Sequence, residues 1–208
     1  MRKIFTLLIV LGLSSFAWAE YDEGIEYEVL EKAQPAPTDG KVEVIEFFSY
    51  ACPHCYRFEP FIEKWQESKS DNVEFIHVPA VFNKNWEALA NLYYAAEWLG
   101  VEEKMHPVIF EAMHGGEGKK ARSFDDLKAI FEANGISGEK LDKAMNEFSV
   151  ANKTLKAKRM TQAYGIKSVP NIVVQGKYRT NGTLAQGHNN VFKVVDHLSE
   201  KIIKEAQN

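Results

Sequence analysis

The sequence is poor in cysteine, in excess charge of either sign and in long apolar runs. Its 208 residues include two cysteines, too few for the disulfide framework on which many small exported domains depend. A chain of this length can bury a substantial core without one. The net charge of −4 gives no electrostatic support for a nucleic-acid partner. The sequence has no internal repeat and no low-complexity tract, which excludes a repeat architecture.

The longest apolar run lies at the N-terminus. Arg2 and Lys3 precede apolar residues 4–13, and Ala17-Trp18-Ala19 fits the small-x-small pattern of a cleavage site. The run is too short, and too closely followed by polar residues, for a membrane span. We therefore predict a signal peptide over residues 1–19, cleaved after Ala19. The mature chain is expected in an oxidising compartment, where a dithiol can be kept as a disulfide.

The first part of the mature chain predicts a β-α-β unit. Residues 41–48 (KVEVIEFF) are β-branched and aromatic, which indicates a largely buried strand, and residues 72–78 (NVEFIHV) alternate as a second strand does. Between them, apolar residues recur at helical spacing, so we expect a helix from near Cys52 to about Ser68. Parallel strands and a right-handed crossover are the expected geometry.

The middle of the chain is helical in pattern, from about residue 86 to residue 164. The segment SFDDLKAIFEANG (123–135) begins with a Ser-x-x-Asp cap and stops at a glycine. Further apolar positions predict core-facing helical stripes: Leu141, Ala144, Met145, Phe148, Leu155, Met160 and Ala163.

Strand signals return after Gly165. Residues 169–180 (VPNIVVQGKYRT) predict two short strands around a turn at residues 175–177. A terminal helix follows, which we expect to be capped near Asn189 or Asn190. The predicted layout is βαβ, then a helical block, then ββα.

The two cysteines form a Cys-Pro-His-Cys sequence at the junction of the first strand and the first helix. In a βαβ context this pattern is typical of a thioredoxin-like redox motif. Cys52 would lie at the helix N-terminus, where unpaired N–H groups and the positive dipole end favour a thiolate. Pro53 suits the first helical turn, because its missing N–H would have no partner there. His54 can add to the stabilisation of the neighbouring sulfur.

Three other interpretations of the pair are weaker. Half of a zinc site would need another ligand pair, but there is no further cysteine, and the histidines lack a compact spacing. A haem attachment would need a histidine directly after the second cysteine, where Tyr56 stands. A purely structural disulfide across so short a loop would restrict little of the unfolded chain. We therefore expect no metal and no cofactor.

Residues 46–60 (EFFSYACPHCYRFEP), with the export signal, the helical block and residues 169–178 (VPNIVVQGKY), resemble the DsbA family of periplasmic thiol:disulfide oxidoreductases. The resemblance covers essentially the whole mature chain. It implies an α/β class, a thioredoxin fold interrupted by an inserted helical domain. The implied boundaries are residues 20–80 and 165–208 for the thioredoxin-like domain and 81–164 for the helical insertion.

The resemblance also assigns roles to residues. It implies that Cys52 is the exposed, attacked cysteine and that Cys55 is buried. A substrate-binding cis-proline after a valine corresponds to Val169-Pro170. Glu46 occupies the position of a buried acid that helps protons move around the dithiol; the alternative is a structural carboxylate that faces a loop or water.

The lysine that often pairs with this acid is not evident. The matching position on the next strand is Phe75. The nearby His77 is interpreted as a hydrogen-bonded strand histidine and not as a catalyst.

The function that the resemblance implies is disulfide donation to reduced, newly exported proteins by a monomer, with reoxidation by a DsbB-like quinone-linked membrane oxidase. Two rival functions stay open. An isomerase or reductase would use the same chemistry, although the chain has no evident dimerisation domain for a DsbC-like isomerase. A peptide-binding or chaperone-like module could hold the disulfide incidentally.

Overall fold

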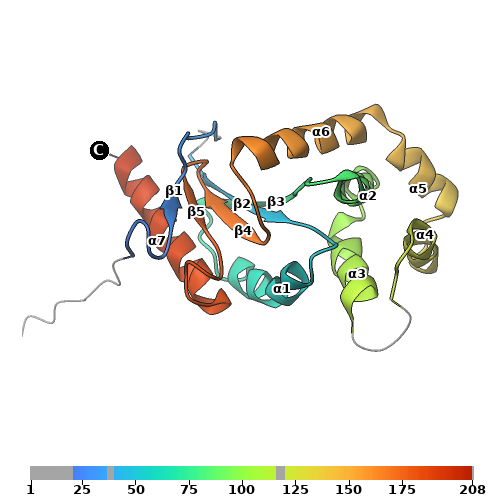
Figure 1. Ribbon diagram of the computed structural model, residues 1–208, viewed down its shortest axis with the longest axis horizontal. Helices are drawn as coiled ribbons and strands as arrows, with labels where there is room; N and C mark the ends of the chain where they lie inside the picture. Colours follow the sequence, from blue (N-terminus) through green and yellow to red (C-terminus); the bar gives the residue numbers. More distant parts are fainter. Residues whose placement is uncertain (1–20, 37–39, 116–119, 208) are drawn as a thin grey trace, which may run out of the picture.

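The computed structural model describes residues 21–36, 40–115 and 120–207 (Figure 1). The predicted signal peptide, residues 1–19, lies outside these residues. The described part contains a five-stranded sheet in the order β1-β5-β4-β2-β3. The strands are β1 (Glu28–Val29), β2 (Val42–Phe48), β3 (Val73–Pro79), β4 (Asn171–Val174) and β5 (Tyr178–Thr180). The helices are α1 (Pro53–Gln66), α2 (Lys84–Trp98), α3 (Glu102–His114), α4 (Phe124–Ala133), α5 (Gly138–Met145), α6 (Phe148–Ala163) and α7 (His188–Ala206).

The predicted β-α-β unit is confirmed. Strands β2 and β3 are parallel, with Val42 beside Val73 and Glu46 beside His77, and α1 connects them. On its other side β2 pairs with β4, antiparallel. Strand β2 is therefore flanked by strands on both edges and by helices on both faces. This position explains why its sequence is almost continuously apolar.

Helices α1 and α7 cover one face of the sheet (Figure 1). Aromatic side chains join the two helices, since Phe192 of α7 stacks on Phe58 and Trp65 of α1 with ring centroids 5.4 and 4.8 Å apart. The opposite face is covered by the end of α6 and the residues that follow it. There Tyr164 packs on Phe47 of β2 at 5.3 Å between ring centroids.

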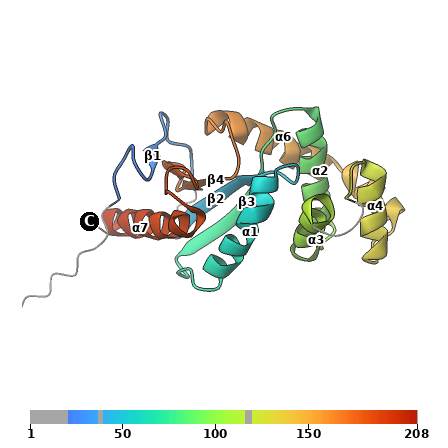
Figure 2. The same cartoon turned by 60° about the horizontal axis from the view of Figure 1, so that its bottom comes forward.

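Helices α2 to α6 fall between β3 and β4 in the chain and pack together beside the sheet, which Figure 2 shows from a second direction. Their shared core contains the fully buried side chains of Leu92, Met105, Ile109, Phe110, Phe131 and Leu141. The fold is thus a thioredoxin-like α/β fold with a helical insertion, as the sequence predicts.

The sequence predicts the start of α4 correctly and the start of α7 incorrectly. The capping box of α4 is confirmed: Ser123 Oγ accepts a hydrogen bond from Asp126 N at 3.1 Å, and Asp126 Oδ2 accepts one from Ser123 N at 3.0 Å. The cap predicted for the last helix at Asn189 or Asn190 is wrong. The helix begins at His188 after Gly187, with no side-chain cap.

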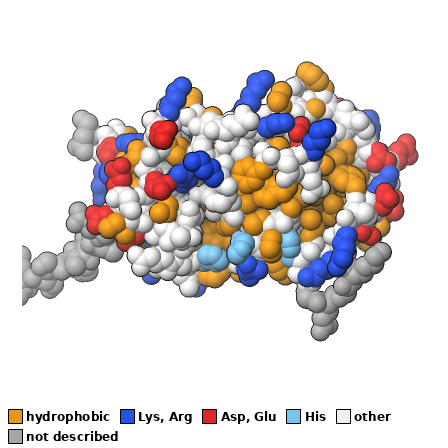
Figure 3. Space-filling view, in the orientation of Figure 1, with side chains coloured by type: hydrophobic (Ala, Val, Ile, Leu, Met, Phe, Trp, Pro, Cys, Tyr) orange, Lys and Arg blue, Asp and Glu red, His pale blue; other side chains and the backbone are white. Residues whose placement is uncertain are grey.

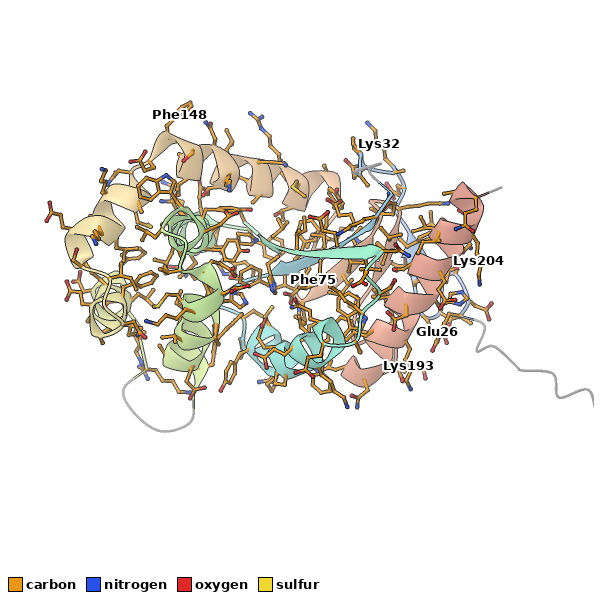
Figure 4. The ribbon with its side chains drawn as sticks, turned by 180° about the vertical axis from the view of Figure 1, so that it is seen from behind. Glu26, Lys32, Phe75, Phe148, Lys193 and Lys204 are labelled. Atoms are coloured by element: carbon orange, nitrogen blue, oxygen red, sulfur yellow. The ribbon has the colours of Figure 1, made fainter. Side chains whose placement is uncertain are left out.

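The predicted core face of α6 is also wrong. Phe148 is 80% exposed and points away from the molecule at the edge of Figure 4, and Leu155 is 43% exposed. The buried positions of α6 are Val150, Thr154, Ala157 and Thr161.

This face of α6 is buried because its threonines form hydrogen bonds with a closely packed helix and loop. Thr154 Oγ1 donates to Asn91 Oδ1 of α2 at 3.1 Å, and Thr161 Oγ1 accepts from Val81 N at 3.1 Å. Small and hydroxyl-bearing residues allow close approach and provide partners for buried polar groups. A search for large apolar residues therefore misses this face.

Candidate active site

Cys52 is positioned by the turn between β2 and α1. Strand β2 ends at Phe48, the chain turns over the next three residues, and Cys52 N donates a hydrogen bond to Ser49 O at 2.9 Å. Cys52 then forms the N-cap of α1 in an extended conformation, and Pro53 is the first helical residue. The thiol of Cys52 is therefore placed at the positive end of the helix dipole, as the sequence predicts.

The surroundings of Cys52 favour its thiolate. A hydrogen bond from the Cys55 thiol, then backbone N–H groups of Cys55 and His54 and the charge of His54, lower the pKa of Cys52 to about 6 against the opposing effect of burial. At neutral pH most of the reduced Cys52 is consequently ionised. An ionised thiol is both a nucleophile and a good leaving group.

Cys55 has the opposite character. It lies one turn into α1, with none of its surface exposed. Burial, the hydrogen bond to Cys52 and the negative charge of Glu46 raise the pKa of Cys55 well above its usual range. The reduced pair is therefore a thiolate beside a protonated thiol, because the same short loop gives its two sulfurs different environments.

The loop before β4 faces Cys52. When it is protonated, the Cys52 thiol donates a hydrogen bond to Val169 O at a sulfur–oxygen distance of 3.5 Å. The Val169–Pro170 peptide bond is cis, as predicted. Both residues are half-buried, so the structure brings together residues that are far apart in the chain.

His54 lies on the exposed side of α1, where its Nδ1 is 2.9 Å from Nη2 of Arg57. Sequence reasoning did not single out Arg57. The i, i+3 spacing of the two residues on a helix that begins at Pro53 was the available signal. Arg57 adds a permanent cation to the side of the site that His54 occupies.

Glu46 is fully buried on β2. Strand alternation places it on the same face as Val44, the face that packs against α1. Its Oε2 is 2.8 Å from Nδ1 of His77, while its Oε1 is buried with no hydrogen-bond partner. Burial, followed by the negative charges of Glu59 and Cys52, raises the pKa of this carboxyl group well above its usual range.

The partner of Glu46 is thus His77 and not a residue at position 75. Phe75 packs its ring against Trp65 and against His77 on the same face, with centroids 5.5 and 4.8 Å apart. The pairing could have been found by aligning the two parallel strands, since Glu46 and His77 are direct neighbours in the register. Sequence reasoning also missed Glu59 of α1 and His106 of α3, which extend this buried polar group.

Figure 3 shows apolar side chains gathered on the face where the sheet meets the helical insertion, with histidines along one border. Among residues 21–36, 40–115 and 120–207, no helix is long and apolar enough to cross a membrane. Within the same ranges, His, Cys, Asp and Glu side chains form no group of three or more that could hold a metal ion.

A Cys-Pro-His-Cys pair at a helix N-terminus, facing a cis-proline on a thioredoxin-like sheet, defines the class of thioredoxin-fold thiol:disulfide oxidoreductases. The sequence model of the DSBA-like thioredoxin domain matches residues 43–199. The chain belongs to the DsbA family and is a thiol:disulfide oxidoreductase.

Individual relatives agree with this assignment. The thiol:disulfide interchange protein DsbA of Pseudomonas aeruginosa is 35% identical over 205 residues, which cover 97% of each chain. The protein of the same name from Burkholderia cepacia is 38% identical over 210 residues, covering 97% of this chain and 98% of the relative. The crystal structure of P. aeruginosa DsbA superimposes with a TM-score of 0.83 at 36% identity, covering 90% of this chain and 97% of that one.

Proposed function

We propose that the protein donates its Cys52–Cys55 disulfide to reduced, newly exported proteins and so catalyses disulfide bond formation. The observation that supports this direction is the position of Cys52 as the N-cap of α1, where hydrogen bonds from the Cys55 thiol and from backbone N–H groups lower its pKa to about 6. Stabilisation of the thiolate belongs to the reduced enzyme alone, so it favours the transfer of electrons to the enzyme. Each pKa unit corresponds to about 1.4 kcal/mol of this driving force.

The reaction consists of two thiol–disulfide exchanges. A substrate thiolate attacks Cys52 Sγ, the Cys52–Cys55 bond breaks, and a mixed disulfide forms while Cys55 leaves and takes up a proton. A second substrate thiolate then attacks the substrate sulfur and displaces Cys52 as a thiolate. In total the substrate loses two electrons and two protons; the enzyme gains both electrons and one proton, and the other proton goes to solvent.

The remaining residues have supporting roles in this proposal. Pro53 and His54 maintain the helix start and the charge that favour the Cys52 thiolate. Val169 and Pro170 form the wall against which an extended substrate segment lies, with backbone groups available for pairing. Glu46 exchanges the proton of Cys55.

Turnover requires that the reduced pair be oxidised again. Proteins of the DsbA family are periplasmic, act on protein substrates and work with a DsbB partner. For this chain we propose a DsbB-like, quinone-linked membrane oxidase as that partner, and export to the periplasm after cleavage at Ala19. We further propose that the protein acts as a monomer, with residues 20–80 and 165–208 as the catalytic domain and residues 81–164 as the insertion.

The test is a reaction between the oxidised protein and a peptide that contains two reduced cysteines. A disulfide donor oxidises the peptide stoichiometrically, and its equilibrium with glutathione lies on the side of the reduced enzyme. Cys52→Ser, the matched control, removes the reaction. A reductase would instead reduce insulin rapidly with glutathione as electron source, and a peptide-binding module would do neither. Either of these results would refute disulfide donation.

A further inference from the structure

Strand β3 forms one edge of the sheet, and in the described part of the chain it pairs with β2 alone. At the start of this pairing Val42 N donates a hydrogen bond to Asn72 O at 2.8 Å. Because the direction of the backbone groups alternates along a strand, Phe75 and His77 direct their N–H and C=O groups away from β2. An edge of this kind can accept a further strand.

The outer edge of β3 lies in a groove. A cavity of about 1010 Å³ is lined by Phe75 and His77 of β3, by α1 on one side, by α6 on the other, and by α2 and α3 at the end nearest the insertion. In the rear view of Figure 4, β3 lies between α6 and α1, with Phe75 on the side of α1. Neither cysteine lines this cavity. The groove is therefore separate from the dithiol, and its volume is that of a ligand site.

The side of the groove formed by α1 and α3 carries negative charge. Glu59 and Glu63 of α1 line it, together with Glu102 and Glu103 of α3. Burial raises the pKa of Glu102, and the negative charges of its glutamate neighbours add to this rise against the opposing effect of His77. The carboxylates thus lie close enough to repel one another, and a cation placed among them would relieve the repulsion.

Two buried atoms on this side have no hydrogen-bond partner within the described residues. They are Oε1 of Glu59 and Nε2 of His106, and both residues line the groove. His106 is 5% exposed, and its Nδ1 lies 3.0 Å from the hydroxyl oxygen of Tyr50. Buried polar atoms without a partner are rare, because each loses its interaction with water and gains nothing in return. Their place in the wall of the groove points to a ligand that brings hydrogen-bonding groups of its own.

The side of the groove formed by α6 has a different character. Lys156 and Arg159 line it, and Met160 and Tyr164 add apolar surface. Ile76 of β3 packs against the same apolar cluster. Successive side chains of a strand point to opposite faces of the sheet. A strand added to β3 would therefore meet carboxylates with one set of alternate side chains, and cations and apolar groups with the other set.

We propose that this groove binds an extended segment of an unfolded substrate protein, which adds to the edge of β3 as a further strand and directs lysine or arginine at alternate positions towards α1 and α3. The choice of occupant rests on the proposed function, since reduced, newly exported proteins are unfolded chains whose backbone groups are free to pair. Main-chain hydrogen bonds supply the affinity, and the alternation of charge supplies the selectivity. The bound segment needs no cysteine.

Fluorescence anisotropy tests the charge of the groove with a labelled, cysteine-free peptide, Lys-Thr-Lys-Val-Lys-Thr-Lys, and the oxidised protein. The same peptide with glutamate in place of each lysine should bind about tenfold more weakly or less. Glu63→Lys, at an exposed position of α1, should weaken binding of the lysine peptide by about three- to tenfold. The matched control is Glu200→Lys on α7, which makes the same change of net charge outside the groove and should leave the affinity unchanged. Equal binding of the two peptides, or equal effects of the two variants, would overturn the proposal.

N-methylation of the lysine peptide tests the addition of a strand. In a paired strand only alternate residues direct their N–H groups to the neighbouring strand. Methylation of one alternate set should abolish binding, while methylation of the other set should change the affinity by no more than about twofold. The lysines are the sensitive set if the added strand is antiparallel, and the residues between them if it is parallel. Loss of binding with both sets, or with neither, would exclude pairing with β3.

Oxidation kinetics test whether the occupant is a substrate. A dithiol peptide is joined to the lysine segment by a flexible Gly-Ser linker of about 20 residues, which spans roughly 25 Å. Its KM should be about tenfold lower than that of the same peptide joined to the glutamate segment. Glu63→Lys should remove this difference and leave the oxidation of the unjoined dithiol peptide unchanged.

The two measurements separate the groove from the dithiol chemistry. Binding of the lysine peptide without any difference in KM would refute a substrate segment as the occupant. If the unmodified protein oxidises no dithiol peptide, the proposed function and this choice of occupant fail together. Anisotropy in that case still shows whether the groove binds an extended basic segment.

Discussion

The free energy of unfolding of the reduced protein should depend on pH in a way that the free energy of unfolding of the oxidised protein does not. The folded pKa of Cys52 is about 6, against about 8.5 in an unfolded chain. A depressed pKa contributes stability that is complete above the unfolded value and is lost as the pH falls through about 6. With these two values, linkage favours the reduced fold by about 1 kcal/mol at pH 7 and by almost nothing at pH 5, solvent screening included.

Cys55 limits the effect at high pH. Its folded pKa is raised, so above about 8.5 the unfolded chain gains a second ionised thiol that the fold does not tolerate. The free energy of unfolding of the reduced protein therefore falls as the pH rises above this value. The advantage of the reduced form should therefore peak near pH 8.5, at about 2 to 3 kcal/mol.

The disulfide crosslink stabilises the oxidised form by an amount that does not depend on pH, and this opposes the advantage of the reduced form. For a closed loop of four residues, the chain-entropy relation gives the oxidised form about 2 kcal/mol. Groups present in both redox forms largely cancel in the comparison. The oxidised protein should thus be the more stable at pH 5, the two forms should be equal between about pH 7 and pH 8, and the reduced form should be the more stable near pH 8.5.

Urea unfolding of the oxidised protein, and of the protein reduced with a phosphine that acts across this range, measures the difference at pH 5, 7 and 8.5. The variant Cys52→Ala serves as the control and should show no pH-dependent response to the reductant. A difference between the two redox forms that stays constant from pH 5 to pH 8.5 would show that Cys52 is not a stabilised thiolate. The physical basis for disulfide donation would then be lost.

Three further outcomes are expected. Iodoacetamide near pH 6 should modify Cys52 in the reduced protein and leave Cys55 unmodified; peptide mapping that finds both labelled alike would contradict the burial of Cys55. His54→Leu should raise the pKa of Cys52 and lower the reduction potential by about 30 mV for each pKa unit, and an unchanged equilibrium with glutathione would remove His54 from the site. Phe131→Ala, in the core of the insertion, should cost about 3 to 5 kcal/mol in urea unfolding; a pKa of Cys52 that moved with it would show that the site depends on that core.

The sequence predicts the catalytic end of the fold well because its signals there are local. Residues 41–48 form β2 over Val42–Phe48, and the helix expected to start near Cys52 begins at Pro53. A buried strand, a helix start and a dithiol each follow from a few consecutive residues. Ser123 and Asp126 also define their helix start by themselves, through two reciprocal hydrogen bonds.

Interactions between distant elements were harder to predict. The polar face of α6 becomes buried because Asn91 and the backbone at Val81 supply partners for its threonines, and neither partner is near α6 in the chain. The pairing of Glu46 with His77 depends on strand register, which is set by the whole sheet. His106 joins the same group from α3, whose position against β3 no local pattern encodes.

The contact between Cys52 and Val169 O spans 117 residues of chain. Strand β2 meets β3 through a short crossover, but it meets β4 only after all of α2 to α6, with Val44 beside Val174. Contacts of such long sequence separation close late in folding, because the loop entropy must be overcome before they form. The Cys52–Cys55 pair is consequently synthesised, and α1 can form, well before the Val169–Pro170 segment packs against it. During synthesis the thiols emerge before the last fifth of the chain, which contains Val169 and Pro170. The position of the insertion within the sheet sets this order.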